Sequence, residues 1–118
     1  METNELIERL FNFSVSTINF LKRLPNTPEF KIIRYQLAKS STSSGANYEE
    51  AQAGSSRADF SNKVRISLRE MRESNYWLRI LKATLPEEKI DNELLWLVQE
   101  SSELKKILGS IVSKTRSS

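Results

Sequence analysis

Six charged or amide side chains in the middle of the chain could be read as a catalytic cluster: Asn47, Glu50, Asp59, Lys63, Glu70 and Glu73. The chain has no His and no Cys, so it lacks the commonest general base, the commonest metal ligand and any thiol nucleophile. It also lacks the Glu-x-x-His pairing that helical metal sites use. We therefore interpret the six residues as a structural polar motif that caps helices, forms ion pairs and fixes helix register. We predict no enzymatic activity, no metal and no cofactor.

The second group with a chemical use is a series of arginines. At 3.6 residues per turn, Arg65, Arg69, Arg72 and Tyr76 fall on one helical face, with Arg79 at its edge. Residues 57–85 hold seven bases and three acids, a net +4, although the whole chain is only +3. Such a face could bind the phosphates of RNA or DNA. The alternative is a solvated face neutralised by pairs such as Glu70 with Lys63 or Glu73 with Arg69.

The same segment carries two apolar faces. One is a core band with helical spacing, made of Phe60, Val64, Leu68, Met71 and Leu78. The other is a mixed face that includes Ile66, Trp77 and Ile80. A surface helix needs only one apolar stripe, so the second stripe predicts a contact between subunits. Alternatively, these three residues complete the core of a single subunit.

Periodicity and punctuation place these faces within four helices, at about 4–24, 28–53, 57–83 and 91–114. Thr27-Pro28-Glu29 is a helix start, Ser56-Arg57-Ala58-Asp59 has the form of a capping box, and Asp91 can cap the last helix. Only three Gly and three Pro occur in 118 residues. We predict an all-α, antiparallel up-and-down four-helix bundle in a single domain, residues 1–118.

The run from Lys39 to Gly45, KSSTSSG, is the difficult stretch. By composition it favours a flexible linker, because six Ser, Thr and Gly residues cost about 3 kcal/mol in a helix relative to Ala. The core phase nevertheless continues through it, from Phe30 through Ser41 and Ser44 to Ala51. Small residues in this phase would let a neighbouring helix approach closely. The residues alone leave linker and helix open.

A resemblance decides between them. The stretch Gly45-Ala46-Asn47-Tyr48-Glu49-Glu50-Ala51-Gln52-Ala53, followed by Ser56-Arg57-Ala58-Asp59-Phe60, Lys63, Leu68-Arg69-Glu70-Met71-Arg72-Glu73-Ser74 and Tyr76-Trp77-Leu78, resembles the four helix bundle protein family. Its members are also called 23S rRNA intervening-sequence proteins. The resemblance covers residues 30–82 in detail and the whole chain in layout. It implies one unbroken helix over residues 28–53.

The resemblance also implies a bacterial protein without enzymatic activity that assembles into a homo-oligomeric, pentameric ring. It implies kinship with the accessory variability protein of diversity-generating retroelements, a basic pentamer that works with nucleic acid and a reverse transcriptase. A reverse transcriptase-like protein is thus an expected partner by distant resemblance. The acidic N-terminus and the short longest apolar run, Leu94 to Val98, predict a cytoplasmic protein without a membrane segment.

Two functions from different classes follow. The first is non-specific binding of RNA or DNA by an oligomer through the basic face. The second is a protein-protein assembly or adaptor module in which the basic face serves solubility.

Overall fold

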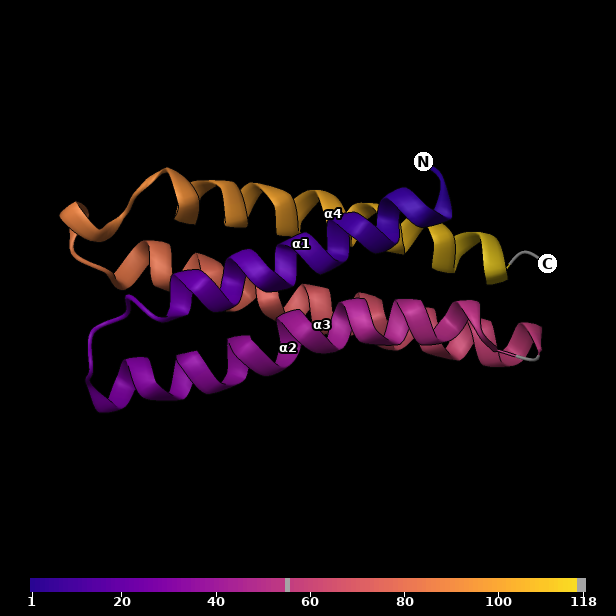
Figure 1. Cartoon of the computed structure of the whole chain (residues 1–118), viewed down its shortest axis with the longest axis horizontal. Coiled ribbons are helices and arrows are strands. Elements are labelled where there is room, and N and C mark those ends of the chain that lie inside the picture. Colours follow the sequence, from indigo (N-terminus) through magenta and orange to yellow (C-terminus); the bar gives the residue numbers. More distant parts are fainter. Residues whose placement is uncertain (55, 117–118) are drawn as a thin grey trace.

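The computed structural model describes residues 1–54 and 56–116, and in this range the chain forms four α-helices and no strand (Figure 1). The elements are α1 (Thr3–Leu21), α2 (Pro28–Gln52), α3 (Arg57–Thr84), the 3₁₀ turn η1 (Glu87–Lys89) and α4 (Asn92–Arg116). They form an elongated body with principal extents of 47 × 23 × 21 Å. No helix in the described part of the chain is both long enough and apolar enough to cross a membrane.

Successive helices run in opposite directions, and the start of α1 and the end of α4 lie at the same end of the bundle (Figure 1). Each helix packs against two others: α1 against α2 and α4, and α3 against α2 and α4. Within the described residues, the diagonal pairs α1–α3 and α2–α4 do not approach each other. This is the neighbour pattern of an up-and-down bundle with short connections, as the sequence predicts.

Local capping chemistry explains where three of the helices begin. The Thr27 hydroxyl accepts a hydrogen bond from the Phe30 N–H (3.3 Å), and the Ser56 hydroxyl accepts one from the Asp59 N–H (3.0 Å). The Asp91 carboxylate accepts from the Leu94 N–H (3.0 Å). Each bond satisfies an N–H that the first helical turn leaves without a partner.

The structure corrects the bounds expected for the first and last helices. α1 ends at Leu21 rather than near residue 24, because Arg23 and Leu24 donate to carbonyls three residues back, at 3.0 and 3.2 Å. These tight turns close the helix before Pro25 is reached. α4 begins at Asn92 and continues to Arg116, two residues beyond the expected end.

α2 runs without a break through the Ser/Thr/Gly stretch, as the core phase and the resemblance predict. Ser40, Ser41, Ser44 and Gly45 are all buried. Ser40 and Ser74 share a hydroxyl–hydroxyl hydrogen bond of 2.8 Å between α2 and α3. A Cβ atom added at Gly45 would lie 3.4 Å from Cβ of Leu10 on α1, in van der Waals contact with it. The small residues therefore allow α2 to approach both of its neighbours closely.

The hydroxyls in this contact are also satisfied, so burying them is not costly. Ser44 donates to the Ser67 carbonyl (2.8 Å) and Ser67 donates to the Ser44 carbonyl (2.6 Å). On the opposite side, Ser14 of α1 donates to the Ser41 carbonyl (2.8 Å). Elsewhere the centre of the bundle is mostly apolar, with Phe13, Leu37, Met71, Leu78 and Leu104 among its fully buried side chains.

Candidate nucleic-acid interface

The four arginines of the predicted basic face lie on the exposed side of α3, and we call them the arginine row: Arg65, Arg69, Arg72 and Arg79. The Arg69 side chain is 73% exposed and approaches Glu70 only at 3.9 Å, a distance at which a surface pair contributes little. Among the described residues, no carboxylate lies within ion-pair distance of the other three arginines. The neutralising pairs of Glu70 with Lys63 and Glu73 with Arg69 do not form in this part of the chain.

Ser67 and Ser74 bond to α2. Glu70 lies three residues after Ser67 and four before Ser74, so it is on the side of α3 next to α2. Asn75 bonds to α4, and Arg72 and Arg79 lie three residues before it and four residues after it. Arg72 and Arg79 thus border the seam between α3 and α4, whereas Glu70 borders α2 and Arg69 is largely exposed to solvent, 3.9 Å from Glu70.

Asn75 organises this seam. Its side chain is 2% exposed, and Nδ2 donates to Ser101 Oγ (2.9 Å) and to the Val98 carbonyl (3.4 Å) on α4. Its Oδ1 accepts from Nε of Arg79 (3.1 Å) and from Nζ of Lys105 (3.2 Å). The Arg79 guanidinium also lies over the ring of Tyr76, with 5.7 Å from Cζ to the ring centroid. Lys105 therefore extends the arginine row from α3 onto α4.

Sequence reasoning did not identify Asn75 or Lys105. Asn75 lies four residues after Met71 and seven after Leu68, so it is a polar residue in the phase of the core band. That position was a readable signal, because a polar group in a core phase needs a buried partner. Lys105 gave no comparable signal, since it is thirty residues from Asn75 and joins the arginines only through the packing of α4.

The predicted interface stripe is half-buried. Ile66, Trp77 and Ile80 are each of intermediate exposure, and Trp77 and Ile80 pack against the core of the same subunit. The indole Nε1 of Trp77 is buried, without an acceptor among the described residues. This arrangement favours the alternative in which the stripe completes the core of one bundle.

Apolar side chains are more exposed on another part of the surface, along α1 and α2. Phe11 is 59% and Val15 44% exposed, and Tyr35 is 65% exposed. A groove of about 280 Å³ runs between the two helices, lined by Phe11, Ser14, Val15, Ile18, Asn19 and Thr42. An adjoining hollow carries Glu49 and Glu50 at its rim. We call these two depressions the α1/α2 groove.

The six residues of the predicted structural polar motif do not converge on one site. Asn47 donates to the Ser43 carbonyl one turn earlier (2.9 Å), and Asp59 lies in the first turn of α3 beside its cap. Glu50 and Glu73 are exposed, while Lys63 and Glu70 are of intermediate exposure. No group of three acidic residues in the described ranges is arranged to hold a metal ion.

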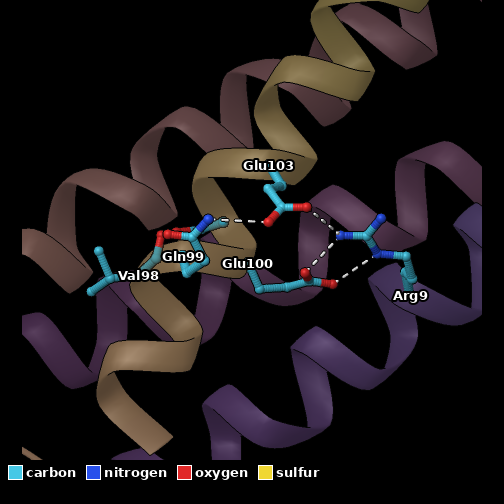
Figure 2. Close-up of polar contacts among 6 residues, drawn as sticks. Arg9, Val98, Gln99, Glu100 and Glu103 are labelled. Carbon is cyan, nitrogen blue, oxygen red and sulfur yellow. Dashed lines mark hydrogen bonds and ion pairs between the residues drawn. The ribbon is translucent and has the colours of Figure 1, made fainter. Parts of the chain in front are cut away.

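An ion pair that sequence reasoning missed joins α1 to α4 (Figure 2). Arg9 of α1 forms a bidentate contact with Glu100 of α4, from Nε to Oε2 at 2.9 Å and from Nη2 to Oε1 at 2.7 Å. Glu103 lies 3.5 Å from Arg9 Nη2 and accepts from Gln99 Nε2 at 3.1 Å. The hydrogen bond to Glu100 raises the pKa of Arg9 above its ordinary value. Arg9 therefore stays protonated, and two carboxylates balance its positive charge, unlike the charges of the arginine row.

Comparison with known proteins places the fold. The sequence profile described as 23S rRNA-intervening sequence protein matches residues 2–110. The chain is 37% identical to a protein of unknown function from the S23 ribosomal protein family of Bacteroides thetaiotaomicron, whose crystal structure it matches with a TM-score of 0.81 over 96% of this chain and 99% of that one. No curated protein matches the chain. This chain belongs to the family of 23S rRNA-intervening sequence proteins.

Proposed function

We propose that this protein is a non-catalytic, self-associating bundle that binds RNA or DNA through the arginine row and Lys105. The observation that carries the proposal is a set of exposed cations on α3, joined at the α3/α4 seam by Lys105, with no carboxylate of the described residues in ion-pair contact except Glu70, at 3.9 Å from Arg69. An unneutralised row of guanidinium groups is suited to phosphates, because each can donate two parallel hydrogen bonds.

Binding of this kind is electrostatic and has little sequence preference. Cations that contact phosphates release counterions, so the affinity falls as the salt concentration rises. On duplex DNA, the logarithm of the binding constant falls with the logarithm of the salt concentration, with a slope of about −0.9 per phosphate contact. Five contacts would give a slope of about −4 to −5. Tyr76 lies beside Arg79 as one surface on which a base could stack, and a single such ring favours backbone contacts over base reading. The family name, which refers to 23S rRNA, supports RNA as the first ligand to test.

The test is fluorescence anisotropy of labelled duplex RNA and duplex DNA, titrated with the protein at low and at physiological salt. We expect binding to both at low salt and a steep loss of affinity at higher salt. Different sequences of one length should bind within a few-fold of each other. The absence of binding at low salt would rule out the proposal.

A second candidate function is an assembly or adaptor module, and the α1/α2 groove favours it. Contiguous exposed apolar surface is a common mark of protein contacts. We infer that its first occupant is another copy of this chain, in line with the pentameric ring implied by the family resemblance. A reverse transcriptase-like partner would be a further protein on the same particle. In this reading, RNA titration fails at low salt while self-association persists.

A further inference from the structure

We propose that Arg79, Lys105 and Asn75 form a preorganised clamp for one backbone phosphate at the α3/α4 seam. The inference rests on the proposed nucleic-acid binding and adds to it a single fixed contact point. In this account Arg65, Arg69 and Arg72 supply diffuse attraction, whereas the clamp sets where the strand lies.

Two cations converge on one neutral oxygen, Oδ1 of Asn75. Nε of Arg79 and Nζ of Lys105 lie 3.1 and 3.2 Å from Asn75 Oδ1, so the two nitrogens can be no farther apart than the sum of these distances. Two oxygens of one phosphate can bridge nitrogens at such a spacing. Each cation uses one N–H on Asn75, which leaves Lys105 two donors and Arg79 four.

The two cations have no counterion among the described residues. An amide oxygen accepts hydrogen bonds but cannot neutralise two positive charges, and like charges this close repel each other. Among the described residues, neither Arg79 nor Lys105 has a carboxylate within ion-pair distance. Arg9, on the other side of α4, shows the contrasting case, with both Glu100 and Glu103 beside it. A bound anion would supply the negative charge that the seam lacks.

The protein holds Asn75 and Arg79 of the clamp in place without a ligand. Asn75 is buried and anchored to α4 through Ser101 Oγ and the Val98 carbonyl. The Tyr76 ring supports the guanidinium of Arg79 from the side. Groups fixed in this way lose little conformational entropy on binding, which favours a tight individual contact.

The clamp favours a polyanion over a small free anion, because it continues directly into the arginine row. Arg72 lies three residues before Asn75 on the same helix, and Arg65 lies two turns further along. An acidic peptide could use the same charges, since a carboxylate and a phosphodiester each offer two charged oxygens, but a nucleic acid carries one negative charge at every nucleotide and can contact the clamp and the arginine row at once. We therefore assign the clamp to a phosphodiester.

The experiment compares two adjacent lysines. Lys105→Gln removes a clamp cation, whereas Lys106→Gln removes the same charge from the next residue, which is exposed and makes no contact with Asn75. Affinity for labelled duplex RNA is measured at low salt, after circular dichroism shows that both variants fold. We expect Lys105→Gln to weaken binding about tenfold, as for a charge-assisted hydrogen bond, and Lys106→Gln to weaken it no more than about twofold.

A second variant tests the neutral oxygen itself. Asn75→Asp places a carboxylate between the two cations, so it should pair with both and weaken RNA binding at least as much as Lys105→Gln. If Asn75→Asp does not fold, the lysine pair decides the question alone. Equal losses in Lys105→Gln and Lys106→Gln would overturn the clamp and leave non-specific binding standing. Failure of the unmodified protein to bind RNA would overturn both, and equal competition by polyglutamate and by unlabelled RNA would overturn the phosphate assignment.

Discussion

Individual ion pairs determine where this protein keeps its positive charge. Arg9 is neutralised by Glu100 and Glu103, and Arg23 lies 2.7 Å from Asp91 and 3.5 Å from Glu93. The contacts of Arg9 join α1 to α4, and those of Arg23 join the turn after α1 to Glu93 of α4 and to the residue that caps it. On α3, the contact of Glu70 with Arg69 at 3.9 Å is the one ion pair that the described residues form with the arginine row, so the row keeps most of its charge. The basic surface thus arises both from the excess of bases in residues 57–85 and from the placement of the acids elsewhere.

Asp91 gives a prediction about acid stability. The Leu94 N–H, and then the Arg23 side chain, favour the charged carboxylate and lower its pKa below the ordinary value. Since the folded pKa is below the unfolded one, this stabilisation is complete above the unfolded pKa and disappears as the pH falls through the folded pKa. Asp91→Ala should lower the free energy of unfolding by about 1 kcal/mol at neutral pH, as expected for a lost cap, and by less at about pH 3.

Urea unfolding of both proteins at pH 7 and pH 3 measures this difference. Glu88→Ala is the matched control, because it removes an exposed carboxylate from the neighbouring turn η1. The control should stay within about 0.5 kcal/mol of the unmodified protein. A deficit in Asp91→Ala that does not change with pH would contradict the role given to the charged carboxylate.

At the scale of elements, α2 shows how packing overrides propensity. Its Ser/Thr/Gly stretch is a poor helix former in isolation. Buried against α1 and α3, the same residues allow close helix approach and satisfy one another's hydroxyls. Their small size in a continuing core phase was visible in the sequence. Their partners Ser67 and Ser74 on α3 were not predicted, because nothing local specifies which serines face each other.

Ser44 provides the direct test of this contact. Ser44→Leu places a large side chain where the serine is fully buried, so overpacking and the lost bonds to Ser67 should cost about 1–3 kcal/mol or more. Ala46→Leu makes a larger change of size two residues away at an exposed position of the same helix, and should cost less than about 0.5 kcal/mol. Denaturant midpoints would measure both. Equal stability of the two variants would mean that the contact between α2 and α3 is not tightly packed.

Three of the four helix starts could be predicted because capping is local, and Thr27, Ser56 and Asp91 act as their sequence contexts indicate. The start of α1 differs, because Glu2 precedes it and makes no side-chain capping bond. The end of α1 could not be placed as well, since it depends on turns that close before Pro25. The same distinction holds for the candidate site. The exposure of the arginine row follows from the phase of one helix, whereas the contribution of Lys105 depends on how two helices pack.

For the whole molecule, the neighbour order of the helices separates two surfaces. The cations border the α3/α4 seam, and the apolar groove lies between α1 and α2, which form the opposite pair of the bundle. One subunit could therefore hold a nucleic acid and a second copy at once. Repetition of the basic seam in an oligomer would strengthen binding through multiple simultaneous contacts.

Self-association can be measured by light scattering at tens of micromolar protein. We expect a mass several times the 13.6 kDa of one chain, and we expect Phe11→Ser, which makes the α1/α2 groove more polar, to lower it. Trp77→Ala examines the contact predicted from the sequence, and it should lower the mass less, because Trp77 already packs against its own core. A monomer under these conditions would leave both apolar surfaces without a partner copy.

The most direct test of the central claim is the salt dependence of RNA and DNA binding in charge-matched variants. Arg65→Gln with Arg72→Gln removes two cations from the arginine row, and Lys31→Gln with Lys39→Gln removes two exposed cations from α2. Anisotropy titrations with duplex DNA over a range of salt give the logarithmic slope for each protein. We expect the slope of the arginine variant to be less negative by about two, roughly one per lost phosphate contact, while the lysine variant keeps the slope of the unmodified protein. Equal slopes in the two variants would contradict the central claim.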